Sequence, residues 1–226
     1  MRTVTPYQWH TGRLTHPLRL LVVSDLHDAP YQDILPLLEG MDALIAAGDT
    51  ANRYRQSYGN GIAFLDEASR RVPTFVGVGN HEMRLKHFAA FREAVGRTQA
   101  QLLFNQTARL GELAIGCWYR PERYGVPDIV PTLAAEPGFR LLLCHKPEEY
   151  MRCLRGADVD LVLAGHAHGG QIRIFGQGLY APGQGIFPRY TRGVVDGRMI
   201  ISAGAGNPVP APRWGNPCEI LQLELD

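Results

Sequence analysis

Five apolar segments of the sequence each stop at an Asp, Asn or His, side chains that bind metal ions and move protons in enzymes. The clearest is VLAGHAHGGQ, residues 162–171, where His166 and His168 follow an apolar run and a glycine. In an extended chain, these two imidazoles would point to the same side. The other four segments end in Asp25 and His27, in Asp49, in Asn80 and His81, and in His145. One such motif is common by chance, but five in this placement indicate a shared site.

The candidate ligands contain oxygen and nitrogen donors and no cysteine. They are Asp25, His27, Asp49, Asn80, His145, His166 and His168. This set suits Mn, Fe or Zn at a reactive centre better than a structural zinc site. If one carboxylate bridges, seven ligands suffice for two metal ions roughly 3.5–4 Å apart. The residues therefore predict a binuclear metal centre.

The elements that must position these residues are buried strands alternating with helices. Apolar runs predict strands at 18–25, 43–49, 73–80, 139–145 and 160–166, and further strands at 112–118, 198–204 and 218–225. Helical spacing occupies 31–40, 61–71, 87–95 and 147–156, whereas 118–138 and 176–193 are expected to be irregular. This interleaving predicts an α/β fold with a largely parallel first half. The polar strand ends should then converge at one edge of the sheet.

Composition places the chain among globular proteins and gives no sign of a polyanionic partner. It has 226 residues and a formal net charge of +1, which indicates neither a nucleic-acid nor a membrane partner. Four scattered cysteines favour reduced thiols and a cytoplasmic location. The first twenty residues lack the apolar stretch of a signal peptide, and no apolar run approaches the roughly 18 residues of a membrane span.

The order of the motifs resembles the calcineurin-like metallophosphoesterase family, in particular its small bacterial single-domain branch. D-x-H, G-D, G-N-H-[DE], H and G-H-x-H follow one another between Asp25 and His168. The resemblance implies a four-layer α/β/β/α sandwich of two mixed sheets flanked by helices. It also implies one metallophosphoesterase domain over residues 1–226.

The resemblance also implies roles for the polar residues. One metal would be held by Asp25, His27 and His168, and a second by Asn80, His145 and His166, with Asp49 as the bridge. His81 would face the phosphoryl group or the leaving oxygen as a catalytic residue. A hydroxide bridging the metals would attack phosphorus in line, without a covalent enzyme intermediate.

One position departs from the common family pattern, which continues G-D-x-x-D. Here the second Asp, which orients the G-N-H histidine in many members, is replaced by Asn52. Two readings are open: Asn52 orients His81 without a charge, or it only caps the following turn. Arg53 either contacts substrate phosphate or is a solvated loop residue. Tyr54 and Val78 fit the Ser/Thr protein phosphatases poorly.

The segment 176–193 should overhang the site because it begins soon after His168. Its Tyr180, Arg189 and Arg192 are candidates to hold a small phosphorylated substrate, for example a nucleotide-like one, although the segment could equally pack on its own aromatic residues. The favoured function is hydrolysis of a phosphodiester or pyrophosphate bond. A small-molecule phosphomonoesterase, a nuclease and a non-catalytic metal-binding scaffold are the alternatives.

Overall fold

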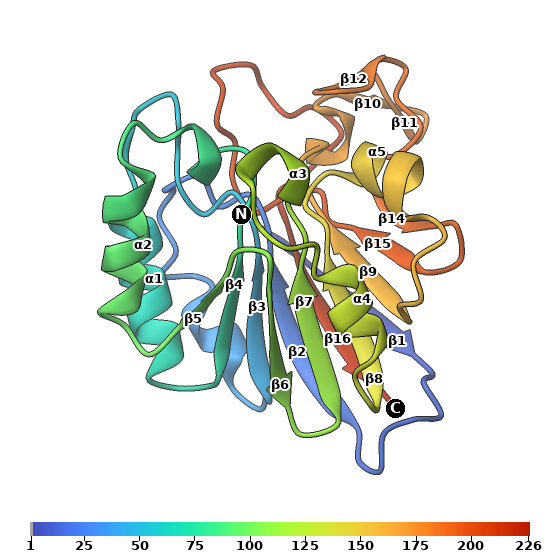
Figure 1. Ribbon diagram of the computed structural model, residues 1–226. Coiled ribbons are helices and arrows are strands. Elements are labelled where there is room, and N and C mark those ends of the chain that lie inside the picture. Colours follow the sequence, from blue (N-terminus) through green and yellow to red (C-terminus); the bar gives the residue numbers. More distant parts are fainter. Residues whose placement is uncertain (1) are drawn as a thin grey trace.

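Two six-stranded mixed sheets pack face to face, with helices on their outer faces (Figure 1). The computed structural model describes residues 2–226. The order of the first sheet is β1 (Thr3–Trp9), β16 (Glu219–Leu225), β2 (Leu18–Val23), β3 (Ala43–Ala47), β4 (Thr74–Gly77) and β5 (Gln101–Leu103). The order of the second is β14 (Gly193–Val195), β15 (Met199–Ile201), β9 (Leu161–Ala164), β8 (Phe139–Leu143), β7 (Leu113–Cys117) and β6 (Gln106–Leu110). The predicted fold class is confirmed.

The central strands are apolar throughout because both of their faces are covered. In β2, Leu20 and Val22 enter the core between the sheets, whereas Leu21 and Val23 pack under the helices of the first sheet. Those helices are α1 (Gly59–Ser69) and α2 (Phe88–Gly96). The second sheet is covered by α4 (Val130–Ala134), α5 (Pro147–Glu149) and the π-helical turn Tyr150–Leu154. Burial of both faces explains the continuous apolar runs of the sequence.

Parallel pairing brings the carboxyl ends of the site-bearing strands to one end of the sandwich. β2, β3, β4 and β5 are parallel in the first sheet, and β7, β8, β9 and β15 in the second. The loops that follow β2, β3, β4, β8 and β9 carry the predicted ligands. The predicted largely parallel first half is therefore confirmed.

All eight predicted strands are present, but the sequence analysis missed the edge strands β1, β5, β6 and β14. Edge strands are covered less and lack long apolar runs; β1, for example, reads TVTPYQW. In the segment predicted as a helix at 31–40, only a 3-10 turn forms at Leu35–Leu38, where Pro36 removes a backbone donor.

The two segments predicted to be irregular contain short regular elements. The first holds α3 (Pro121–Tyr124) and α4. The second begins within the first of two small hairpins. In the first hairpin, β10 (Arg173–Ile174) pairs with β11 (Gln177–Gly178). In the second, β12 (Tyr180–Ala181) pairs with β13 (Gly185–Ile186). Within residues 2–226, no helix combines the length and apolar character needed to cross a bilayer.

Candidate metal centre

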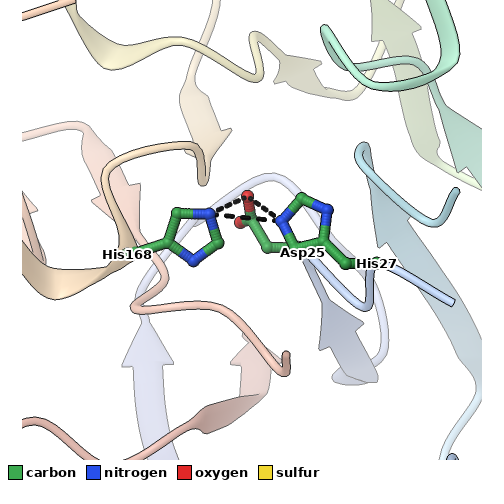
Figure 2. Close-up of side chains that lie close together, drawn as sticks. All are labelled: Asp25, His27 and His168. Carbon is green, nitrogen blue, oxygen red and sulfur yellow. Dashed lines mark hydrogen bonds and ion pairs between the residues drawn. The ribbon is translucent and has the colours of Figure 1, made fainter. Parts of the chain in front are cut away.

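Buried carboxylate and imidazole groups form two separate clusters where the strand ends meet, and a third group, His27, Asp49 and His81, shares one residue with each. Asp25, His27 and His168 make the first cluster (Figure 2), and Asp49, His145 and His166 make the second; within each, the potential ligand atoms lie within 4.8 Å of one another. Asp25 Oδ1 lies 3.6 Å from His27 Nε2 and 3.5 Å from His168 Nε2. The same oxygen is 3.7 Å from His145 Nε2, so the two clusters adjoin.

The seventh predicted ligand, Asn80, lies beside the second cluster. Its side chain and Asp49 both line the cavity described below. Asn80 Oδ1 is buried and has no hydrogen-bond partner. All seven predicted ligands are therefore buried at one end of the sandwich, as their order in the sequence indicated.

The backbone at the candidate ligands is unusual. Asp25, His27, Asp49, His166 and His168 have φ angles of 55°, 52°, 55°, 67° and 47°. The chain is therefore not extended at His166 and His168, and the two imidazoles lie in adjoining clusters, one in each. Left-handed conformations are uncommon outside glycine and concentrate at functional sites, where the surrounding structure enforces them.

Glycines next to the ligands allow the backbone to approach the carboxylates closely. A Cβ added at Gly165 would collide with Ser24 Oγ and Asp25 Oδ2. A Cβ at Gly79 would collide with Asp49 Oδ1. The glycine of G-H-x-H and that of G-N-H thus make room for the two carboxylates.

Hydrogen bonds to the second ring nitrogen orient the imidazoles. His145 Nδ1 lies 2.9 Å from the carbonyl oxygen of Ala47, which requires a proton on Nδ1 and leaves Nε2 as the atom that can bind either a proton or a metal. That Nε2 lies 3.1 Å from Asp49 Oδ2 without forming a hydrogen bond. Both atoms are thus free to share a cation.

His81 and His27 form a second oriented pair. The backbone N–H of Arg53 donates to His81 Nδ1 at 3.2 Å, so the neutral His81 ring carries its proton on Nε2. His27 Nδ1 lies 3.1 Å from His81 Nδ1 and is the second donor to it. This arrangement leaves the His27 Nε2 lone pair directed to Asp25 and His168.

Glu82, which the sequence analysis gave no role, holds the loop around Asp49. Its buried carboxylate accepts the backbone N–H groups of Asp49, Ala51 and Gly79 at 2.9, 2.7 and 2.8 Å. Burial raises the pKa of Glu82 to about 7, with the Asp49 charge as a further cause. Its place directly after His81 in G-N-H-E was the available signal.

The charges of the clusters fit a metal. Burial raises the pKa of Asp25, but the nearby His168 and His145 outweigh it and hold that pKa well below its usual range. Burial lowers the pKa of His166 and of His168 to about 3. Burial would also lower the pKa of His145, but the charges of Asp49 and Asp25 outweigh it and raise that pKa to about 10. Two buried carboxylates require compensating positive charge, of which the imidazolium of His145 supplies one unit and a bound cation would supply the rest. Together with the unpartnered Asn80 Oδ1 and His145 Nε2, these donors fit bound cations.

Comparison with known proteins agrees with this geometry. A profile described as calcineurin-like phosphoesterase matches residues 18–170, which is most of the chain. The chain belongs to the calcineurin-like phosphoesterase family. The match ends just after the last candidate ligand, so it contains both clusters.

Relatives in this family include a Campylobacter jejuni protein called an uncharacterized metallophosphoesterase, which is 26% identical over 94% of this chain and 60% of its own length. The Escherichia coli phosphodiesterase YaeI is 29% identical over 70% of this chain and 63% of its own. The chain thus spans less than two thirds of these relatives. The sulfate thiohydrolase SoxB of Thermus thermophilus shares the fold, with a TM-score of 0.50 and 14% identity over 83% of this chain and 52% of its own.

A cavity of about 650 Å³ opens over the two clusters of this metallophosphoesterase. Asp49, Asn80, His81, His166 and His168 form part of its wall. Its basic residues are Arg53, Arg84, Arg120, Lys146 and Arg152, but Glu148 and Glu149 also line it, and Glu149 pairs with Arg120 and Lys146. The volume lies within the usual range for small-molecule sites. Within the described residues, Arg53, Arg84 and Arg152 form no ion pair and are the basic side chains of this wall that suit an anionic ligand. Arg84, Lys146 and Arg152 had no motif that marked them.

Of the four residues predicted to contact substrate, two line the cavity and two do not. Arg53 and Tyr180 line the cavity. Arg192 does not line it; its guanidinium pairs with the buried Glu219 and contacts Thr5. Arg189 is exposed outside the cavity wall. The prediction for Arg192 is therefore wrong, because Glu219 holds its guanidinium. The contact predicted for Arg189 stays a prediction.

The hypothesis that Asn52 orients His81 is also wrong. Asn52 Oδ1 accepts the backbone N–H groups of Tyr54 and Arg55 at 3.0 and 3.2 Å, and its Nδ2 donates to the carbonyl oxygen of His27. Asn52 thus caps the turn, which was the alternative reading. The N–H of Arg53 takes the orienting role instead.

Proposed function

We propose that this protein is a binuclear metal-dependent phosphoesterase that hydrolyses a phosphodiester or pyrophosphate bond. The observation that carries the proposal is the pair of adjoining buried clusters beneath a basic cavity. Asp25, His27 and His168 would hold one metal, and Asn80, His145 and His166 the second, with Asp49 between them. Bound Mn, Fe or Zn would supply a hydroxide nucleophile near neutral pH and neutralise the phosphate oxygens.

The chain's own residues position and stabilise the phosphoryl group. His81 lines the cavity, and the Arg53 N–H at its Nδ1 leaves Nε2–H as the donor. That donor can hydrogen-bond to a phosphate oxygen or to the leaving oxygen. Arg53 stands beside it, and its guanidinium is held by the Tyr54 hydroxyl at 2.7 Å. These groups place a donor and a cation at the same side of the cavity.

The size of the cavity favours a diester or a pyrophosphate over a small monoester. About 650 Å³ exceeds the space that one phosphate group needs. The cavity has basic residues from segments after β3 and β4 on one sheet and after β7 and β8 on the other. The two groups attached to a central phosphorus would then each meet basic side chains, one from each sheet. A phosphomonoesterase, which would need only one of these walls, is the second candidate.

The test compares initial rates on bis-p-nitrophenyl phosphate and p-nitrophenyl phosphate, with added Mn²⁺ and after chelation. His81→Ala is the test variant, and His16→Ala, at an exposed histidine, is the matched control. Metal-dependent diester cleavage that falls at least about 100-fold in His81→Ala alone supports the proposal. Activity confined to the monoester favours the second candidate. No turnover by metal-loaded protein favours the scaffold.

A further inference from the structure

The large hydrophobic side chains that this protein exposes are concentrated beside the cavity. Nine are exposed among the described residues, and six of them come from the two small hairpins and the loop before β16. We call these six the apolar rim: Ile174, Phe175, Tyr180, Ile186, Phe187 and Trp214. Their exposed fractions run from 39% for Ile174 to 106% for Phe175. Such a concentration on a soluble fold marks an interaction site.

Hydrogen bonds join the segments of the apolar rim at the end of the sandwich that carries the cavity. Tyr180 pairs with Ile186 across the second hairpin. Gln177 Nε2 donates to the carbonyl oxygen of Pro188 and so joins the first hairpin to the second. The N–H of Arg173 donates to the carbonyl oxygen of Trp214, which adds the loop. Figure 1 shows the hairpins beside α5, and Tyr180 itself lines the cavity.

The fold does not require an aromatic side chain at Phe175 or at Phe187. Phe175 and Gly176 connect β10 to β11 with φ angles of 48° and 82°, a two-residue turn with both φ angles positive. Asn-Gly is the usual sequence in such turns, and a bulky residue is unfavourable at the first position. Phe187 also has a positive φ, of 52°. Two phenylalanines thus occupy conformations that favour Asn or Gly, with their rings in solvent.

The charges of the segments around the apolar rim indicate which class of partner it can bind. Residues 169–193 and 202–217 contain four arginines and no Asp or Glu, although the chain as a whole has 22 acidic residues. Three of the four, Arg173, Arg192 and Arg213, form hydrogen bonds within the protein, whereas Arg189 is exposed. Arg84 and Arg152 add exposed positive charge at the cavity. An anionic partner meets no carboxylate from either segment.

We propose that the apolar rim docks on an anionic lipid surface. Exposed phenylalanine, tryptophan and isoleucine next to arginine are the side chains that enter the boundary between head groups and acyl chains. The isoleucines distinguish this surface from a nucleic-acid platform, which uses aromatic and basic residues. Given the proposed function, docking would hold the mouth of the cavity against head-group phosphodiesters.

Docking can be measured without catalysis, by co-sedimentation with vesicles of phosphatidylcholine alone or containing phosphatidylglycerol. The double variant Phe175→Asn with Phe187→Asn places a residue that tolerates positive φ at both positions. We expect the wild type to bind phosphatidylglycerol vesicles at least about tenfold more tightly than the double variant, with binding weakened by added salt. Cleavage of bis-p-nitrophenyl phosphate in solution should be the same in both.

A matched pair separates the apolar rim from general surface hydrophobicity. Ile174→Thr and Val4→Thr each remove a β-branched apolar side chain from a short or edge strand, and both residues are 39% exposed. Only Ile174→Thr should weaken vesicle binding. Equal binding by wild type and double variant, or no binding by the wild type, would overturn the proposal. If the wild type is a dimer and the double variant is a monomer, the apolar rim binds a second copy of this chain, which would also overturn the proposal. If the wild type binds vesicles but does not cleave bis-p-nitrophenyl phosphate, the result counts against the proposed function alone.

Discussion

His27 and His81 face each other through their Nδ1 atoms at 3.1 Å, and this contact joins a candidate metal ligand to the candidate catalytic histidine. The N–H of Arg53 donates to the same His81 nitrogen. His81 therefore accepts hydrogen bonds with one side of its ring and offers Nε2–H to the cavity with the other. The residue proposed to contact substrate also orients a residue proposed to contact metal.

His81→Ala should consequently weaken metal binding as well as catalysis. Loss of a group that orients a ligand typically lowers metal affinity about tenfold or more. Titration of the metal-free protein with Mn²⁺ against a competing chelator measures this effect without substrate. His81→Asn, whose carbonyl can still accept from His27, should recover part of the affinity but not the rate. Equal affinity in wild type and His81→Ala would show that the contact does not orient His27.

Gly165→Ala should displace Asp25. An added Cβ would collide with Ser24 Oγ and Asp25 Oδ2, both buried and neither able to retreat into solvent. Overpacking of this kind costs about 1–3 kcal/mol of unfolding free energy, and the shift of Asp25 should abolish tight binding of one metal equivalent. Metal analysis after gel filtration gives the stoichiometry. Gly156→Ala, where a Cβ meets nothing within 4 Å, is the matched control and should bind like the wild type.

Glu82→Gln should destabilise the loop that carries Asp49. The carboxylate accepts three backbone N–H groups through two oxygens, whereas an amide has one acceptor oxygen and would turn a donor toward backbone donors. An unsatisfied buried donor costs about 1–3 kcal/mol. We expect the melting temperature of the metal-free protein to fall by about 4 °C or more, measured by calorimetry. An unchanged melting temperature would mean that the three bonds add nothing to stability.

The pH dependence of stability can be tested at a pair remote from the metal centre. Burial alone would raise the pKa of Asp160, but hydrogen bonds from Arg140 outweigh it and lower that pKa below its usual value. Because the folded-state pKa is below the unfolded one, the pair stabilises the protein above about pH 4, and this contribution is lost as the pH falls through the folded-state pKa.

Asp160→Asn should therefore lower the free energy of unfolding by about 1 kcal/mol at pH 7, and the difference from wild type should shrink at pH 3. Urea unfolding at both pH values measures it. Asp158→Asn, which pairs with the same arginine but whose side chain is 75% exposed, should change stability by less than about 0.5 kcal/mol. A difference for Asp160→Asn that is equal at both pH values would exclude the ionic contribution.

The sequence predicted the central strands and the convergence of seven polar residues because one physical rule governs both. A strand covered on two faces must be apolar throughout, so a polar residue at its end stands out, as Asp25 does after β2 and His145 does after β8. The backbone conformation at those ends could not be predicted in the same way. Positive φ at Asp25 or His166 depends on contacts between both sheets, which local sequence does not encode.

The errors at Asn52 and Arg192 have a related cause. Residue types suggested a side-chain partner for His81, but its partner is the backbone N–H of Arg53, which every residue except proline could supply. The position of Arg192 depended on Glu219, which belongs to β16 in the other sheet. A net charge of +1 likewise says nothing of where charges lie, so it could not reveal the acid-free segments at the cavity.

The segment before β16 should matter for metal binding although it lies more than 40 residues beyond the last ligand. Asn216 is buried, and its Nδ2 donates to the carbonyl oxygens of His168 and Gln171 at 2.7 and 3.0 Å. Asn216→Ala removes both bonds and frees the His168 turn, so Mn²⁺ affinity should fall about tenfold. Asn207→Ala, an exposed residue of the same segment that bonds only within it and to Gln171, is the matched control. If both variants bind Mn²⁺ as the wild type does, the end of β9 alone holds His168 in place. The hydrogen bonds from Asn216 would then not contribute to metal binding.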